Sequence, residues 1–191
     1  MLKDIVKANR SYRSFDESVT FTKEQLAEFV DYARFAPASV NLQPLKYRLI
    51  CEQEEVEVMR PLTRWARNLP GMTLPPQGHH ATGFVIICHD TSVSPNVDRF
   101  MKDVGIVAQT IMLAAVEAGY GGCMIGNFTP KDVAEAFALP EEMVPVLVLA
   151  LGKPDEEIHL IPLPEDGDTR YYRDEEGNHF VPKRSLEQVL I

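Results

Sequence analysis

The 191-residue sequence has few of the residues that build cross-linked proteins and no segment suited to a membrane. Its three cysteines, Cys51, Cys88 and Cys123, lie far apart among apolar neighbours, which fits buried, reduced thiols rather than disulfides. No apolar run approaches the roughly 20 residues that cross a bilayer. The first segment, MLKDIVKANRSYRSF, lacks the long apolar stretch of a secretory leader. We therefore expect a cytoplasmic protein that does not enter a membrane.

Positive charge is scarce as well. The chain has 19 lysines and arginines against 28 acidic residues, for a formal net charge of −9 at pH 7. Binding to nucleic acid or to an anionic membrane needs basic residues clustered in excess, so the composition argues against both as partners. Any site for an anion must therefore be local.

Motifs of hydrolytic, metal-dependent and nucleotide-binding enzymes are also missing. The sequence contains no nucleophile elbow, Walker loop, HExxH motif or carboxylate dyad. The glycines within 119–122 end a predicted helix instead of joining a strand to a helix, so they do not form a dinucleotide fingerprint. Adjacent pairs such as His79-His80 and Cys88-His89 rarely direct two ligands at one ion, so we predict no metal site. The chemistry must come from elsewhere.

What is present is an ordinary globular composition, with 45% hydrophobic and 25% charged residues, and a length that fits one domain over residues 1–191. Periodicity predicts helices interleaved with buried strands. The helices are expected at 2–9, from 22 to at most 36, at 54–63, in the first part of 103–128 and after 129, and the strands at 47–51, 83–88 and 144–151. This order predicts an α/β or α+β architecture around a central sheet.

The residues from 152 onward have a different character. They include four prolines, and the segments 170–173 and 178–181 flank the turn-forming run 174–177. We therefore predict an extended C-terminal tail over 152–191 that contains a hairpin.

Two helix starts carry clear capping signals. Thr22 and Gln25 form a capping box, and Pro37 requires that the helix end before it. Thr129 followed by Pro130 places a capping hydroxyl and a proline where a new helix begins.

The stretch 103–128 is predicted to be a buried helix that runs into a glycine-rich segment. Apolar residues cover most of the helix circumference. Gly105, Ala108 and Ala115 share one side with Met112, and the small residues would allow another helix to approach closely. We predict a helix–helix contact on this side, as a candidate seam between two subunits.

Two polar segments are candidate binding loops, although the residues alone leave a structural alternative open for each. Residues 10–15, RSYRSF, place two arginines after a helix, where they suit a phosphate or merely pair with the helix end. Residues 38–44, ASVNLQP, place three amphiprotic side chains at alternate positions. These suit the edge of a heteroaromatic ring, or they satisfy the backbone of the loop.

Four segments follow one another along nearly the whole chain. They are RSYRSF at 10–15, APASVNLQP at 36–44, DVG at 103–105 with CMIGN at 123–127, and LALGKP at 149–154. Together they resemble the nitroreductase family of FMN-dependent oxidoreductases. The resemblance implies an α+β fold with a mixed central sheet flanked by helices. It also implies an intertwined homodimer with one FMN in each of two sites between the subunits.

The resemblance further implies which residues hold the flavin. Carried over position by position, the residues at the FMN phosphate and ribityl chain are Arg10, Ser11 and Arg13, and Lys183 and Arg184 are further phosphate contacts. The residues that reach the flavin from the partner subunit are Ser39, Asn41 and Gln43. The backbone amides of Gly126 and Asn127 face flavin N5 and O4. Several basic residues suit a phosphate dianion in an otherwise acidic chain. A backbone amide among small residues can come close to N5.

The implied activity is hydride transfer from NAD(P)H through flavin N5 to an electron-poor small molecule, such as a nitroaromatic or a quinone. Flavin and nicotinamide carry this chemistry, so no catalytic side chain is expected. Two alternatives stay open: other flavin chemistry on the same fold, such as enone reduction or flavin fragmentation, and a flavin-binding dimeric module without turnover.

The sequence departs from the family pattern in two respects. Leu45 occupies a position where tryptophan is common, and the chain has little room for inserted helices above the active site. A lid must therefore come from residues 64–80 or from the tail at 168–182.

Overall fold

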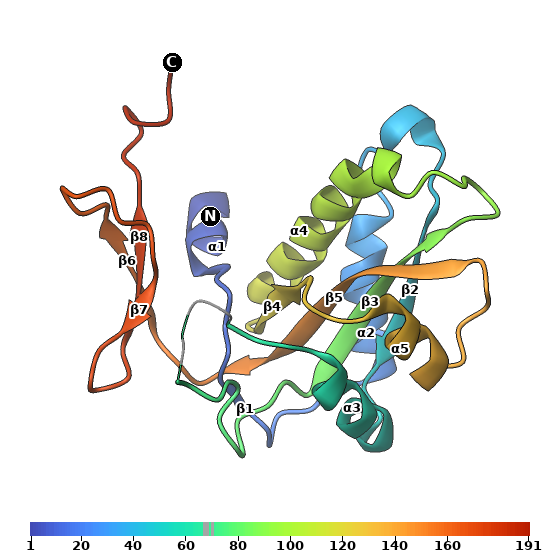
Figure 1. Cartoon of the computed structure of the whole chain (residues 1–191), viewed down its shortest axis with the longest axis horizontal. Coiled ribbons are helices and arrows are strands. Elements are labelled where there is room, and N and C mark those ends of the chain that lie inside the picture. The colour runs from blue at the N-terminus through green and yellow to red at the C-terminus, as the bar shows by residue number, and fades with distance from the viewer. Residues whose placement is uncertain (67–68, 70) are drawn as a thin grey trace.

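The structure is a computed structural model that describes residues 1–66, 69 and 71–191. Its centre is a five-stranded sheet with helices on both faces (Figure 1). The strands run in the order β1-β5-β3-β2, and β4 also pairs with β5. Their bounds are β1 Phe15–Asp16, β2 Leu45–Ile50, β3 Gly83–Asp90, β4 Gly121–Ile125 and β5 Met143–Pro154. The ladders are antiparallel, while an isolated bridge between Ser11 and Gly122 is parallel. The α+β class with a helix-flanked sheet is confirmed.

The helices follow the predicted order. Their bounds are α1 Leu2–Ala8, α2 Lys23–Ala33, α3 Gln53–Met59, α4 Met101–Glu117 and α5 Pro130–Ala136, with 3-10 turns at Ser39–Asn41, Arg60–Leu62 and Asp98–Phe100. The capping box is confirmed, because the Gln25 amide donates to Thr22 Oγ1 over 3.3 Å and the Thr22 amide donates to Gln25 Oε1 over 2.8 Å. The predicted strands at 47–51, 83–88 and 144–151 are confirmed within β2, β3 and β5, with ends shifted by up to three residues.

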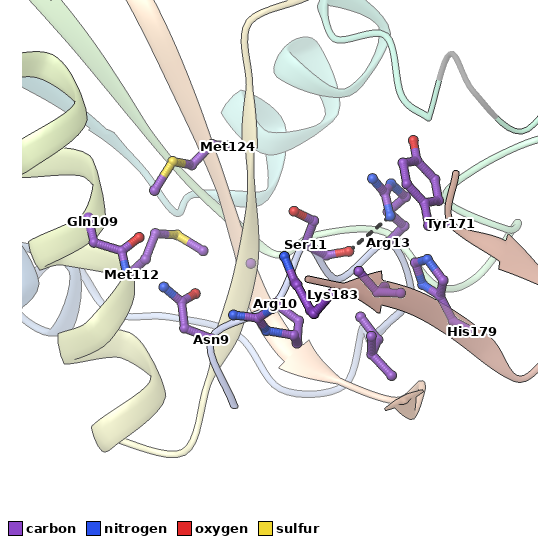
Figure 2. Close-up of a pocket in the computed structure, with 13 residues that line it drawn as sticks. Asn9, Arg10, Ser11, Arg13, Gln109, Met112, Met124, Tyr171, His179 and Lys183 are labelled. Atoms are coloured by element: carbon purple, nitrogen blue, oxygen red, sulfur yellow. Dashed lines mark hydrogen bonds between the residues drawn. The ribbon is translucent and has the colours of Figure 1, made fainter. Parts of the chain in front are cut away.

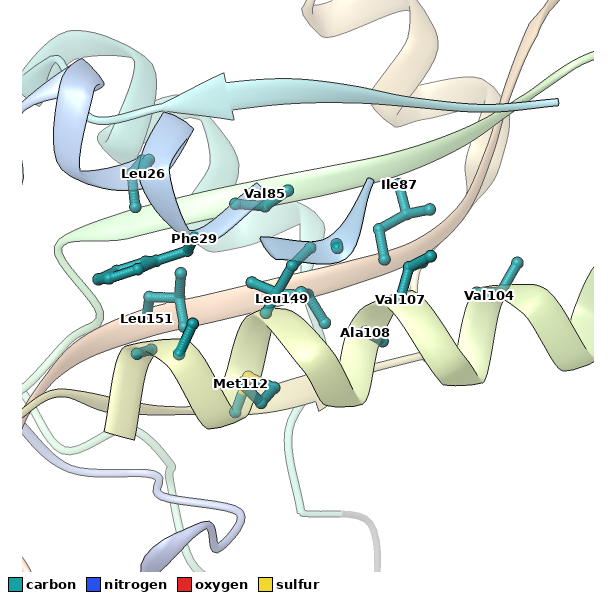
Figure 3. Packing of buried hydrophobic residues seen from close by; sticks show 14 of the residues in the cluster. Leu26, Phe29, Val85, Ile87, Val104, Val107, Ala108, Met112, Leu149 and Leu151 are labelled. Atoms are coloured by element: carbon teal, nitrogen blue, oxygen red, sulfur yellow. The ribbon is translucent and has the colours of Figure 1, made fainter. Parts of the chain in front are cut away.

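Strand β3 is buried along its whole length because helices cover both of its faces. Val85 and Ile87 lie in a core cluster with residues of α2 and α4 (Figure 3). Phe84 and Ile86 point to the opposite face, where residues of α3 and α5 complete a second cluster. Burial on both faces explains why β3 is a continuous apolar run rather than an alternating pattern.

The glycine-rich end of the stretch 103–128 is a strand that the sequence did not predict. Helix α4 ends at Glu117, Gly119 has a φ of +85°, and β4 begins at Gly121. A Cβ atom added to Gly122 would lie 2.2 Å from the Ala150 carbonyl oxygen of β5. The glycine therefore allows β4 to approach its neighbour closely, and it does not merely terminate the helix.

The predicted seam on α4 is wrong for two of its residues. Ala108 and Ala115 are 0% exposed and belong to the core cluster between α4, α2 and the sheet. The predicted helix–helix contact exists, but it joins α4 to α2 within one chain. Gly105 and Ile106 lie on the exposed side of α4 and are free to meet another chain.

The tail forms a separate small sheet beside α1 (Figure 1). Its strands are β6 Ile158–Pro162, β7 Tyr172–Arg173 and β8 His179–Lys183, in the order β6-β8-β7. The predicted hairpin is confirmed, with Tyr172 opposite Phe180 in an antiparallel register. The parallel partner β6 was not predicted. Within the described part of the chain, no helix combines the length and apolar character needed to cross a membrane.

Candidate functional site

The segment after α1 lies along the edge of β4. The Tyr12 amide donates to the Gly122 carbonyl over 3.0 Å, and Ser11 forms the parallel bridge to the same residue. This pairing holds the side chains of Arg10 and Arg13 at a defined place beside the sheet. The positions of these two arginines in the sequence, directly after a predicted helix, could not establish this location.

A cavity of about 310 Å³ opens between this segment, β4, α4 and the tail sheet (Figure 2). We call it the basic cavity. Its polar and charged wall residues are Asn9, Arg10, Ser11, Arg13, Gln109, Tyr171, His179 and Lys183. Three of these are Arg or Lys, and none of the described residues on its walls is an Asp or Glu. The cavity is therefore locally positive in a chain whose net charge is −9.

Two guanidinium groups in the basic cavity have donors to spare. Arg13 is 8% exposed, and its Nη1 donates to the Ser11 carbonyl over 3.1 Å. Arg10 Nη2 donates to the Val6 carbonyl over 3.0 Å. The Nε atoms of both arginines are buried without a hydrogen-bond partner among the described residues. Unpaired buried donors cost free energy, so this donor set fits an anionic group with several oxygens, such as a phosphate.

The tail is fastened to this segment through one carboxylate. Glu156 accepts a hydrogen bond from the Arg13 backbone amide and another from the Arg173 guanidinium. The Arg13 guanidinium carbon lies 4.7 Å from the centre of the Tyr171 ring, at cation–π distance. Glu156 therefore binds the backbone amide of Arg13, and the Arg13 side chain remains part of the cavity lining.

A second cavity of about 390 Å³ adjoins the first, since Arg13, Met124 and Tyr171 line both. We call it the aromatic cavity. Its other walls include Arg64, Trp65, Gly126 and Asn127. The Arg64 amide donates to the Asn127 carbonyl over 3.0 Å, which fixes the start of the 64–80 loop to the residues after β4. Residues 67, 68 and 70 of that loop lie outside the described part of the chain.

Cys123 lines the aromatic cavity but is a poor nucleophile. Burial raises the pKa of its thiol, although the Arg13 charge and the Ser11 hydroxyl act in the opposite direction. Burial also raises the pKa of Cys88 to about 12. Because the thiolate is the reactive form, neither group is suited to nucleophilic chemistry at neutral pH.

The adjacent histidines excluded above as metal ligands have other partners. His79 Nδ1 contacts Asp155, and His80 Nδ1 lies 2.6 Å from Glu17 Oε1. These contacts tie the end of the 64–80 loop to the N-terminal segment and to the end of β5.

One chain brings together six of the ten predicted site residues. Four lie in the basic cavity, namely Arg10, Ser11, Arg13 and Lys183, and two lie in the aromatic cavity, namely Gly126 and Asn127. Arg184 is exposed and is not on either wall. The roles of all of these residues stay predictions.

The remaining three residues lie elsewhere in the same chain. The Ser39 amide and hydroxyl donate to the buried Asp103 carboxylate over 2.8 and 2.6 Å, which ties the loop to the start of α4. Asn41 and Gln43 are exposed, each with a φ of +53°. Gln43 borders a different pocket, next to Asp103.

Several residues on the cavity walls were not predicted. Trp65 and Tyr171 come from the two segments considered as lids, and both border the aromatic cavity. His179 was missed although its position carried a signal. Every second residue of a strand points to the same face. His179 precedes Lys183 by two such steps on β8, and both residues line the basic cavity.

The structure is an α+β protein with a basic cavity where the central sheet meets its C-terminal tail. A sequence model of the nitroreductase family matches residues 6–153. The chain therefore belongs to the nitroreductase family, as the resemblance indicated.

Individual relatives agree with this assignment. A Bacillus subtilis protein described as an NAD(P)H nitroreductase is 26% identical over 185 residues, which span 81% of this chain and 88% of the relative. An FMN reductase (NADPH) from the same species is 27% identical over 166 residues, spanning 76% of this chain and 63% of that protein. Among solved structures, a nitroreductase from Exiguobacterium sibiricum in complex with FMN has a TM-score of 0.71 at 24% identity, covering 87% of this chain and 94% of that one.

Proposed function

We propose that the protein is an FMN-dependent oxidoreductase that uses NAD(P)H to reduce an electron-poor small molecule, such as a nitroaromatic or a quinone. The observation that carries this proposal is a basic cavity with spare buried donors that adjoins an aromatic cavity. Bound FMN supplies the hydride chemistry, while the protein binds and orients it. The names of the NAD(P)H nitroreductase and FMN reductase relatives, and the FMN complex of the similar structure, support the assignment.

The basic cavity is the proposed phosphate site. Arg10 and Arg13 donate their unpaired Nε–H groups, and Ser11 and Lys183 add a hydroxyl and an ammonium donor. Guanidinium and ammonium donors form stronger hydrogen bonds to a phosphate than neutral groups do. Arg184, in the exposed segment that follows β8, is proposed as a further phosphate contact.

The aromatic cavity is the proposed place of the isoalloxazine ring and the acceptor. The backbone amides of Gly126 and Asn127 offer donors without a bulky side chain, since a Cβ at Gly126 would meet nothing within 4 Å. Trp65 and Tyr171 offer apolar surface for a planar acceptor and exclude water from the ring. We therefore assign the lid to both segments, 64–80 and 168–182, rather than to one of them.

A homodimer completes this site, with each chain forming a single domain over residues 1–191. Ser39, Asn41 and Gln43 belong to the flavin site of the partner, because their own chain holds them away from its cavities. Large apolar side chains are exposed at the end of α2, in the following loop and on α4; they are Tyr32, Phe35, Val40, Leu42 and Ile106. Such exposed apolar surface favours an interface between subunits.

We place the enzyme in the cytoplasm. Its three cysteines form no disulfide, which fits a reducing compartment.

The test is steady-state oxidation of NADH and NADPH by the FMN-loaded protein, with a nitroaromatic, a quinone and an enone as acceptors. We expect oxidation of at least one coenzyme that depends on a nitroaromatic or quinone. Turnover with the enone alone would replace the proposed acceptor class. No coenzyme oxidation with any acceptor would contradict the proposal and favour a flavin-binding module without turnover.

A further inference from the structure

His179 is the most deeply buried polar residue among those described on the wall of the basic cavity. Its side chain is 1% exposed, and neither ring nitrogen has a hydrogen-bond partner among the residues that the structure describes. A buried polar group without a partner is destabilising. Its place in a cavity wall therefore points to a ligand that hydrogen-bonds to it.

The two ring nitrogens of His179 have different surroundings. Nδ1 lies 3.5 Å from Glu156 Oε2, within ion-pair distance but without the geometry of a hydrogen bond. The Tyr171 ring lies 5.6 Å away and covers another side of the imidazole. Nε2 is the nitrogen that remains for a ligand.

The position of His179 on β8 places it with the other basic groups. His179, Val181 and Lys183 alternate onto the same face of the strand and line the basic cavity. Arg13 and Arg10 line it from the N-terminal segment (Figure 2). A ligand that hydrogen-bonds to His179 in this cavity therefore also lies close to three positively charged side chains, so an anionic ligand is favoured.

We propose that His179 donates a hydrogen bond from Nε2 to the phosphate of FMN, as an additional basic contact beside Arg10, Arg13 and Lys183. This inference rests on the proposed FMN dependence.

The test compares FMN with riboflavin, which has the same ring and ribityl chain but no phosphate. The full-length protein is freed of flavin, and the Kd of each flavin is measured by quenching of flavin fluorescence. The variant His179→Phe keeps a flat ring and removes both nitrogens. His179→Gln keeps a side-chain N–H donor. The control is His159→Phe on β6, because His159 stacks on Phe180, with ring centroids 5.2 Å apart, and is not on the cavity wall.

We expect His179→Phe to weaken FMN binding by about tenfold to a hundredfold, the effect of losing one charge-assisted hydrogen bond, and to change riboflavin binding less than about twofold. His179→Gln should recover part of the FMN affinity, and His159→Phe should behave as wild type. Riboflavin binding also reports that the variant pocket is intact.

Two results would overturn the assignment while leaving FMN dependence in place. Unchanged FMN affinity in His179→Phe would show that the ring does not contact the phosphate. Equal losses for FMN and riboflavin would place its effect in the fold or at the ribityl chain. A wild-type protein that binds neither flavin would instead contradict the proposed function itself.

Discussion

At the scale of single residues, Arg13 is held more firmly than the other cations of the basic cavity. Its backbone amide donates to Glu156, its Nη1 donates to the Ser11 carbonyl, and its guanidinium lies against the Tyr171 ring. A side chain already fixed in place loses little conformational entropy when it binds a ligand. Arg13 should therefore contribute more to phosphate affinity than Lys183, whose position at the end of β8 is exposed.

Substituting Arg13 tests its proposed role at the phosphate. Arg13→Ala should weaken FMN binding by about tenfold to a hundredfold, because a charge-assisted contact of about 1.5–3 kcal/mol is lost. The control is Arg170→Ala, since Arg170 pairs with Asp168 on the exposed part of the tail and is absent from both cavity walls. Equilibrium titration with FMN measures both variants. Equal flavin affinity in Arg13→Ala and wild type would contradict the phosphate assignment.

The cysteines give a second prediction at this scale. Because burial raises the pKa of Cys88 to about 12 and also raises that of Cys123, both stay protonated at pH 7–8 and lack the reactive thiolate. A thiol reagent should modify at most Cys51 in the native protein and all three cysteines after unfolding. Rapid modification of Cys123 in the native state, located by mass spectrometry, would show that the aromatic cavity holds an active thiol.

At the scale of helices and strands, local signals predicted the elements whose structure depends on local contacts. The capping box at Thr22 and the apolar run of β3 are examples. Strand β4 was missed because glycines disfavour strands by themselves. Its formation depends on the approach of Gly122 to Ala150, which is distant in sequence. The sequence also indicated that α4 has a small-residue face, but it could not indicate that α2, rather than a partner, covers it.

Gly122→Ala tests the role given to β4. The added Cβ would lie 2.2 Å from the Ala150 oxygen, so the strand must shift, and we expect a loss of about 3 kcal/mol in the free energy of unfolding. Gly126→Ala is the matched control, because a Cβ there would meet nothing within 4 Å, and it should change stability by less than about 0.5 kcal/mol. Urea unfolding of the flavin-free protein measures both. Equal stability of the two variants would contradict the close β4–β5 packing.

The cavity walls show why the site was predicted only in part. The N-terminal arginines were visible as a motif, and Lys183 was visible through the family resemblance. His179 and Tyr171 reach the same cavity only because β6 and β7 pair with β8 and Glu156 fastens that small sheet to Arg13. No local pattern predicts these tertiary contacts.

At the scale of the whole molecule, the residues proposed to contact the flavin do not all come together within one chain. The residues proposed at the phosphate adjoin the Gly126 loop, whereas Asn41 and Gln43 are exposed and lie on neither cavity wall. In the proposed homodimer, a second copy presents this loop to the cavity and completes the set. Such a shared site ties flavin retention to dimerisation.

Ile106→Asp tests that link. Ile106 is 42% exposed on α4, within the proposed interface, so a charge there should produce monomers and reduce FMN retention together. Val58→Asp is the control, because Val58 is similarly exposed, at 45%, but lies on α3 at the opposite face of the sheet. Light scattering and flavin absorbance of the same samples give both quantities. A monomeric Ile106→Asp variant with full FMN content would contradict a site shared between subunits.

The central claim, that this chain is an FMN-dependent NAD(P)H oxidoreductase, is tested most directly by anaerobic titration of the FMN-loaded protein. Adding NADH or NADPH should bleach the visible flavin absorption with about one coenzyme per flavin, since each hydride carries two electrons. Adding a quinone or nitroaromatic afterwards should restore the absorption. A protein that cannot be loaded with FMN, or whose flavin spectrum is unchanged by both coenzymes, would contradict the claim.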